Sequence, residues 1–165
     1  MYSVKETVME YSFYKLLHIF AIILFLGNII TGLFWMWFAV RTKEVKIISH
    51  TIRGIILADN IFTTPGVIII IATGVMAAMI GHFPILGTGW ILWPIILFSI
   101  SGVAFMSRVA PLQRSLAVFT SEAEASGNLD WIKFQSLYHS WELWGIVATV
   151  TPLAAAVMMV LKMPK

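Results

Sequence analysis

Residues 19–40, IFAIILFLGNIITGLFWMWFAV, contain no Asp, Glu, Lys or Arg. A helix needs about 20 predominantly apolar residues to cross the hydrocarbon core of a bilayer. This stretch therefore predicts a membrane-spanning helix, which we place at residues 12–38. The apolar run is too long for the core of a signal peptide, and no small-residue cleavage site follows it, so we expect the helix to be retained.

The composition extends this interpretation to all 165 residues. Hydrophobic residues make up 59% of the chain and charged residues 12%, whereas soluble domains carry about 25% charged residues. Further apolar runs predict three more spans, at residues 54–80, 89–107 and 137–161. The predicted fold class is all-α, an integral membrane four-helix bundle with both termini on the same side and a single transmembrane domain over residues 1–165.

The connecting segments predict the orientation. Gly81, Pro84 and Gly87 predict a short uncharged hairpin between spans two and three. We read the other two connections as long loops, and they hold seven of the 11 basic residues: Arg41, Lys43, Lys46, Arg53, Arg108, Arg114 and Lys133. The positive-inside rule then places both loops inside and both termini outside. In the last loop, residues 121–130 predict a helix end and a turn, and Asp130 is a candidate N-cap for an amphipathic lead into span four.

Several function classes are excluded by what the sequence lacks. The chain has no cysteine, which removes disulfides, thiolate metal sites, iron–sulfur clusters and cysteine nucleophiles. There is no basic run or nucleic-acid motif, so we expect no nucleic-acid partner. No spacing typical of a zinc hydrolase, a phosphate-binding loop or a facial triad occurs.

His18 is the most unusual residue of span one. It lies about one turn inside the span, with Lys15 one turn before it. An ionisable residue at such depth is costly without a partner and usually indicates a relay, a pathway or a bound cofactor. A hydrogen-bonded bundle histidine and a proton relay are the alternatives to a cofactor ligand.

Span two carries a further intramembrane ionisable residue, Asp59. Asp59 and Thr63 are four residues apart and share a helix face, while Pro65 removes a backbone donor and weakens the helix nearby. Two readings remain open. In the first, the helix is kinked and Asp59 pairs with a nearby arginine. In the second, Asp59 faces a cavity used by a cofactor, a quinone or a proton.

Histidine is a common axial ligand of haem iron. The ligating nitrogens of two axial histidines lie about 4 Å apart, taking about 2 Å for each metal–nitrogen bond. His50 and His139 are predicted at the inner ends of their spans, and a bilayer core is about 30 Å thick. Of the three other histidines, only His82 in the outer hairpin is therefore a candidate partner for His18.

The residues also resemble a known family. Tyr14–His18 (YKLLH), followed by Gly27 and Arg41, resembles the first helix of the bacterial membrane protoporphyrinogen oxidases. It also resembles a family of predicted integral membrane proteins of unknown function, family 2269. Further similar positions are Arg53, residues 64–66 (TPG), 73–74 (TG), 89–90 (GW) and 158–162 (MMVLK).

The resemblance covers most of the chain and implies a compact four-helix bundle that carries b-type haem. In the oxidases a first-helix histidine and a span-three lysine matter for function. His18 matches the histidine, but residues 91–95 (ILWPI) and the rest of span three contain no lysine. Family 2269 is therefore the better match, and its default location is a prokaryotic inner membrane.

We therefore expect a small membrane protein that binds haem b and serves electron transfer or a haem-linked redox role. His18 is the expected axial metal ligand and His82 its candidate partner. Lys15 is expected to contact a haem propionate or a lipid phosphate, and Asp59 to act as a supporting or proton-carrying group. Expected partners are membrane lipid and a quinone or other redox partner. The main alternative is a non-catalytic accessory subunit that packs as a homo-oligomer or in a larger complex. A third reading is a transporter-like bundle around Asp59 and Glu142.

Overall fold

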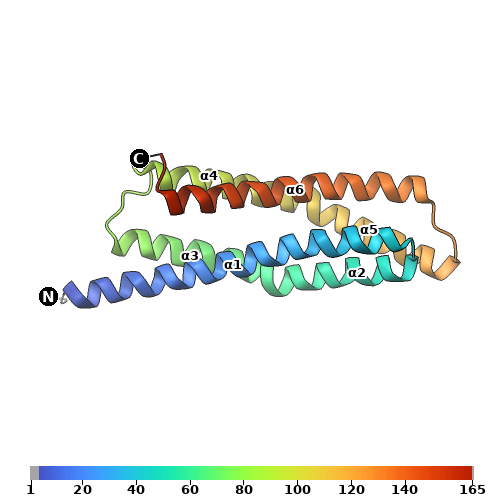
Figure 1. Cartoon of the computed structure of the whole chain (residues 1–165), viewed down its shortest axis with the longest axis horizontal. Helices are drawn as coiled ribbons and strands as arrows, with labels where there is room; N and C mark the ends of the chain where they lie inside the picture. Colours follow the sequence, from blue (N-terminus) through green and yellow to red (C-terminus); the bar gives the residue numbers. More distant parts are fainter. Residues whose placement is uncertain (1–3, 165) are drawn as a thin grey trace.

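The computed structural model describes residues 4–164, and within them every regular element is a helix. The elements are α1 (Val4–Thr42), α2 (Val45–Ala58), η1 (Asp59–Thr63), α3 (Thr64–Ile80), α4 (Gly89–Ala104), η2 (Phe105–Val109), α5 (Ala110–Ser126) and α6 (Trp131–Leu161). They form four long rods that lie side by side, because α2, η1 and α3 run on as one rod and α4, η2 and α5 as another (Figure 1). The predicted all-α four-helix bundle is confirmed, and both chain ends lie at the same end of it.

The two ends of the bundle differ. We call the end with the 43–44 and 127–130 turns the loop end, and the end with the 81–88 hairpin and both termini the hairpin end. The rods are 31 to 38 residues long in the candidate spans, about 46–57 Å at 1.5 Å per residue. A bilayer core is only about 30 Å thick. The bundle therefore continues beyond the membrane as well as through it.

This length corrects the prediction of two long loops. Only residues 43–44 separate α1 from α2, and residues 108–126 continue the third rod as helix. The charged residues there occupy the exposed face of amphipathic helices. On α2, Ile48, Ile52 and Ile55 are buried while Lys46 and Arg53 are exposed. The four predicted spans all fall inside the observed rods.

Two rods change from α-helix to one π-helical turn just before a proline. Pro65 follows η1 by two residues and Pro111 follows η2 by two residues. Proline has no N–H and its ring clashes with the carbonyl four residues before it, and a local π turn can re-satisfy the backbone groups that such a proline frees. The predicted weakening of span two near Pro65 therefore takes the form of a π turn that carries Asp59.

The core is dense at the loop end and divided at the hairpin end. Met36, Ile48, Ile52, Leu116 and Phe134 are fully buried in the larger cluster toward the loop end. Toward the hairpin end a smaller cluster surrounds Ala21, Phe25 and Ile70. There α1 packs against α3 and α4 packs against α6, as two layers (Figure 1). This division leaves room for a cavity between the helix pairs.

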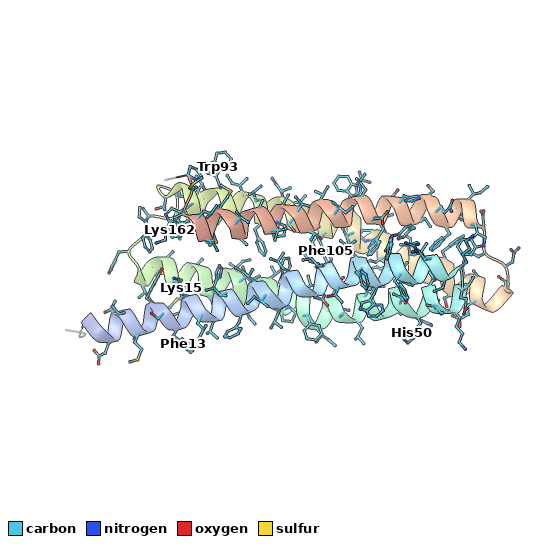
Figure 2. All side chains as sticks on the ribbon, viewed as in Figure 1. Phe13, Lys15, His50, Trp93, Phe105 and Lys162 are labelled. Carbon is cyan, nitrogen blue, oxygen red and sulfur yellow. The ribbon has the colours of Figure 1, made fainter. Side chains whose placement is uncertain are left out.

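The outer surface is apolar over most of its length. Large exposed side chains include Ile68 at 64% and Val103 at 67% exposure. In water such a surface would lead to association, whereas lipid tails cover it without penalty. Figure 2 shows the side chains that project from all four rods, with Lys15 near the hairpin end and His50 near the loop end.

Candidate functional site in the membrane-spanning bundle

His18 projects from α1 onto α3. Its Nδ1 lies 2.9 Å from the Ile70 carbonyl oxygen and 3.3 Å from Thr73 Oγ1. The ring rests over Gly74, where an added Cβ would be 2.9 Å from His18 Cε1. A glycine is therefore needed at this point for the imidazole to lie against the α3 backbone.

These contacts define the state of the ring. The Ile70 carbonyl can only accept, so Nδ1 carries the hydrogen and donates it. Nε2 is then left with a free lone pair. It is buried, and no hydrogen-bond partner for it occurs in the described part of the chain. Buried polar atoms are rarely left without a partner, so Nε2 is the atom of this side chain that still has an unused acceptor site.

Nε2 belongs to a residue that lines a cavity of about 290 Å³ between the helix pairs. The walls come from all four rods and include Phe25, Ile91 and Pro152. The polar side chains among the lining residues are His18 and Ser99, and Ser99 Oγ already donates to the Ile95 carbonyl at 2.8 Å. His18 thus supplies the one open polar group of an apolar chamber.

The other predicted site residues lie elsewhere. His82 is exposed in the hairpin with a left-handed φ of 54°, and it does not line the His18 cavity. Lys15 is exposed on α1 and does not line it either. Asp59 lines a different cavity nearer the loop end. Of the predicted set, the structure brings only His18 to this chamber.

Asp59 is 6% exposed and is held by three neutral side chains. Asn28 Nδ2 donates to Oδ1 at 3.0 Å, Thr63 Oγ1 donates to Oδ1 at 2.7 Å, and Gln113 Nε2 donates to Oδ2 at 2.9 Å. Asn28 Nδ2 also lies 2.9 Å from Thr63 Oγ1. The network joins α1, η1 and α5 near the middle of the bundle.

The reading in which Asp59 pairs with an arginine is therefore wrong. Arg53 instead lies 3.7 Å from Glu124, and the Arg108 guanidinium lies over the Trp144 ring. The shared helix face of Asp59 and Thr63 is confirmed by their hydrogen bond, whereas the sequence did not predict the partners Asn28 and Gln113. Asn28 stands out as a lone amide in an apolar span, but Gln113 was assigned to a loop.

The fold and the cavities define a polytopic integral membrane protein, a bundle of four helices long and apolar enough to cross a bilayer. The family described as predicted integral membrane protein (DUF2269) matches residues 12–163, and the chain belongs to this family. No curated protein and no solved structure matches this chain.

Proposed function

We propose that the His18 cavity binds b-type haem, whose iron His18 Nε2 would hold, and that the protein serves electron transfer within the membrane. The observation that carries the proposal is the buried, unpartnered Nε2 of a ring whose Nδ1 donates to a backbone carbonyl. Metal-ligating histidines typically hold their second nitrogen in this way, which sets the tautomer and raises the basicity of the ligating nitrogen.

The donor set fits this cofactor. Within the described residues no group of three or more His, Cys, Asp or Glu is placed to hold a bare metal ion. Haem supplies the four equatorial nitrogens itself, so a single protein imidazole is enough to anchor it. When bound, haem provides a one-electron redox couple. His18 then orients the ligand, and the apolar walls keep water away.

The cavity also fits a ligand that arrives from the bilayer. Its volume of about 290 Å³ is close to the lower end of ligand pockets, roughly 300–1,000 Å³. Ile71, Val75 and Ile95 line it and are exposed on the lipid-facing surface. An apolar molecule can therefore enter sideways, and a larger one extends past this rim. A membrane quinone that reaches the same rim is the expected redox partner.

The likeness of Tyr14–His18 to the first helix of the membrane protoporphyrinogen oxidases adds support for haem. It does not extend to their reaction, since α4 has no lysine. We therefore propose haem binding and electron transfer without oxidation of protoporphyrinogen.

An absorption spectrum tests the proposal. The wild-type protein, expressed with haem supplied and purified in mild detergent, is expected to show a Soret band. His18→Ala is expected to lose it. His82→Ala is the matched control and is expected to keep it, because His82 is exposed outside the cavity.

The outcomes separate the alternatives. A well-folded wild-type protein with no Soret band would overturn the proposal. If that protein co-purifies with other subunits, the accessory-subunit function is favoured instead. If the Soret band is lost in His18→Ala and also in His82→Ala, the pair of histidine ligands expected from the sequence is favoured.

We also propose a prokaryotic inner membrane with both termini outside. The support is the distribution of charge, because the seven basic residues of the predicted loops belong to the half of the bundle that ends at the loop end. Positive residues favour the cytoplasmic side.

A further inference from the structure

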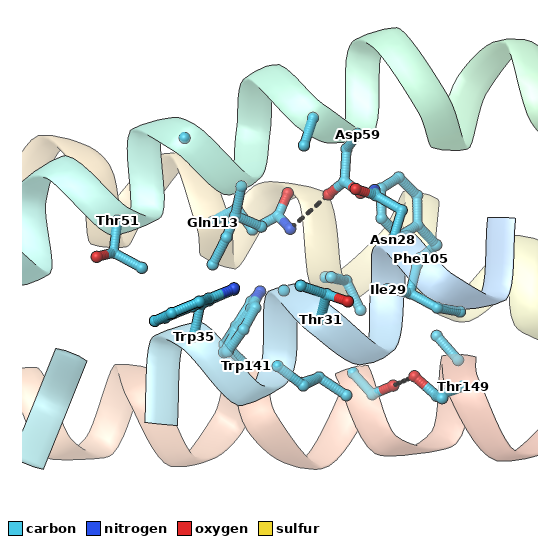
Figure 3. A pocket seen from close by; sticks show the side chains of 18 of the residues that line it. Asn28, Ile29, Thr31, Trp35, Thr51, Asp59, Phe105, Gln113, Trp141 and Thr149 are labelled. Carbon is cyan, nitrogen blue, oxygen red and sulfur yellow. Dashed lines mark hydrogen bonds between the residues drawn. The ribbon is translucent and has the colours of Figure 1, made fainter. Parts of the chain in front are cut away.

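The Asp59 network borders a second cavity, of about 280 Å³, which shares no lining residue with the His18 cavity. Unlike the His18 chamber, it has many polar lining residues: Asn28, Thr31, His50, Thr51, Asp59, Gln113 and Thr149. Figure 3 shows Asp59 and Gln113 along one side and Trp35, Trp141 and Thr31 along the other. Such a chamber offers several groups that can hydrogen-bond to water, set among apolar walls.

Trp141 gives independent evidence for a polar occupant. Its side chain is 2% exposed, and its indole Nε1 has no acceptor in the described part of the chain. In Figure 3 the nitrogen edge of the ring points into the cavity toward Gln113. Buried N–H donors are nearly always paired with protein or ordered water. The cavity has ample room for water, since one molecule needs about 10–15 Å³ of such space.

Asp59 has no cationic partner. Its three donors are two amides and a hydroxyl, and no Lys, Arg or His of the described residues lies within ion-pair distance. A buried carboxylate without a counter-charge is unfavourable, particularly in a membrane. A bound proton removes that charge.

The geometry allows both states of the carboxyl. When Asp59 is ionised, the Thr63 hydroxyl donates to it at 2.7 Å. When Asp59 is protonated, the Thr63 hydrogen can rotate away so that Oγ1 accepts from the carboxyl instead. The Oδ2 oxygen, which receives one bond from Gln113, keeps a second acceptor position.

The route for protons comes from the loop end. Asp59 is six residues from the exposed Arg53, about 9 Å along the helix. His50, Thr51 and Gly54 line the cavity on that side. Toward the hairpin end, the apolar cluster of Ala21, Phe25 and Ile70 and a third cavity of about 210 Å³ with a mainly apolar lining lie between Asp59 and His18. The path of polar groups from the loop end therefore stops at the Asp59 network.

We propose that this cavity is a water-filled half-channel and that Asp59 is a reversible proton-binding site reached through it from the loop end. In the binding step, a proton passes from a hydronium ion in the cavity to a carboxylate oxygen and leaves a water molecule behind. Among the lining residues from α1, α2, η1, η2, α5 and α6, the titratable groups are Asp59 and His50. Of these two, His50 is the exposed one.

Infrared spectroscopy of the purified protein tests the site. The wild-type protein is expected to show a protonated-carboxyl C=O band that disappears as pH rises and shifts quickly in heavy water. Asp59→Asn keeps the shape of the side chain and is expected to lose that band. If no band depends on Asp59 at any pH, or if the band shifts only after unfolding, the proposal is wrong.

A second measurement needs no change at Asp59. Dicyclohexylcarbodiimide reacts with protonated carboxyls in apolar surroundings, so mass spectrometry is expected to find Asp59 labelled at low pH and unlabelled at high pH.

Gly54→Leu, which adds bulk at the cavity wall, is expected to slow deuterium exchange of the Asp59 carboxyl. Gly27→Leu is its control, since Gly27 lines neither cavity and an added Cβ there meets no atom within 4 Å. Equal exchange in the two variants, or a small organic cation retained at Asp59 in native mass spectra, would contradict a water-filled proton site.

Discussion

Gly74 determines where the His18 imidazole can lie. An alanine there would put its Cβ 2.9 Å from His18 Cε1, whereas carbon atoms prefer about 3.5–4.0 Å. Gly74→Ala is therefore expected to push the ring off α3 and lengthen its 2.9 Å hydrogen bond to Ile70. The variant should lose most of the Soret absorbance and about 1–3 kcal/mol of stability, as overpacking usually does.

The control for this change is Gly102→Ala on α4, where an added Cβ has no neighbour within 4 Å. It is expected to keep both the spectrum and the melting temperature. If Gly74→Ala binds haem as well as Gly102→Ala does, then haem binding does not depend on the position of the His18 ring.

Asn28 supports Asp59 from a different helix. Asn28→Ala removes a donor that contacts both Asp59 and Thr63. Loss of one partner of a buried polar group costs about 1–3 kcal/mol, and thermal unfolding in detergent should show it. Thr31→Ala, three residues along α1 and exposed, is expected to unfold near the wild-type temperature. If Asn28→Ala and the wild-type protein melt at the same temperature, water replaces the Asn28 amide without a loss of stability.

At the scale of the elements, the sequence predicts the turn before α6, with a helix end and a turn within residues 121–130 and an N-cap at Asp130. Gly127 ends α5 with a left-handed φ of 70°, a conformation that glycine adopts without strain. Asp130 then caps α6 and accepts from the backbone N–H groups of Ile132 and Lys133, both at 3.1 Å. The predicted cap is confirmed because the signal for it is local in sequence.

Replacement of the cap measures its contribution. Asp130→Ala is expected to lower the stability by about 0.5–2 kcal/mol, as for other N-cap aspartates, and to fray the first turn of α6. Hydrogen exchange at Ile132 and Lys133 reports on that turn directly. Asn128→Ala in the same turn is the comparison, since Asn128 is exposed and, within the described residues, only its backbone oxygen takes part in a hydrogen bond. An unchanged exchange rate in Asp130→Ala would show that packing alone holds the start of α6.

The helices α2 and α5 were the elements that sequence reasoning misjudged. The charged residues of these helices are typical of loops, although Ile48, Ile52 and Ile55 repeat at helical spacing. For α5 the same signal is weaker, because its buried positions include Gln113 and Thr120. Hydropathy identifies where a helix crosses the membrane, but it does not find where an amphipathic helix continues outside.

The candidate site could be predicted from the sequence only in part, because most of its contacts join residues that are far apart in the chain. His18 could be singled out because an ionisable residue in an apolar span is rare. Its Ile70 and Gly74 contacts depend on how α1 and α3 are aligned, which no local pattern encodes. The same holds for the bond between Gln113 and Asp59, which are 54 residues apart.

For the molecule as a whole, the two cavities lie toward different ends of the bundle and differ in the polarity of their lining residues. The His18 chamber lies toward the hairpin end and is apolar, while the Asp59 chamber lies toward the loop end and has more polar side chains in its lining. The cluster of Ala21, Phe25 and Ile70 lies between them. If His18 binds haem and Asp59 binds a proton as proposed, this cluster and the mainly apolar cavity of about 210 Å³ beside it would lie between the two sites.

The charge distribution leads to a prediction about orientation. The chain contains no cysteine, so single substitutions report topology without background. Leu86→Cys lies in the hairpin, where Leu86 is 81% exposed, and Asn128→Cys lies in the exposed turn at the loop end. With basic residues favouring the cytoplasm, a membrane-impermeant maleimide applied to intact cells is expected to label Leu86→Cys. Asn128→Cys should react only after the membrane is opened. The reverse pattern would place the mouth of the Asp59 cavity outside the cell, and protons would then reach Asp59 from that side.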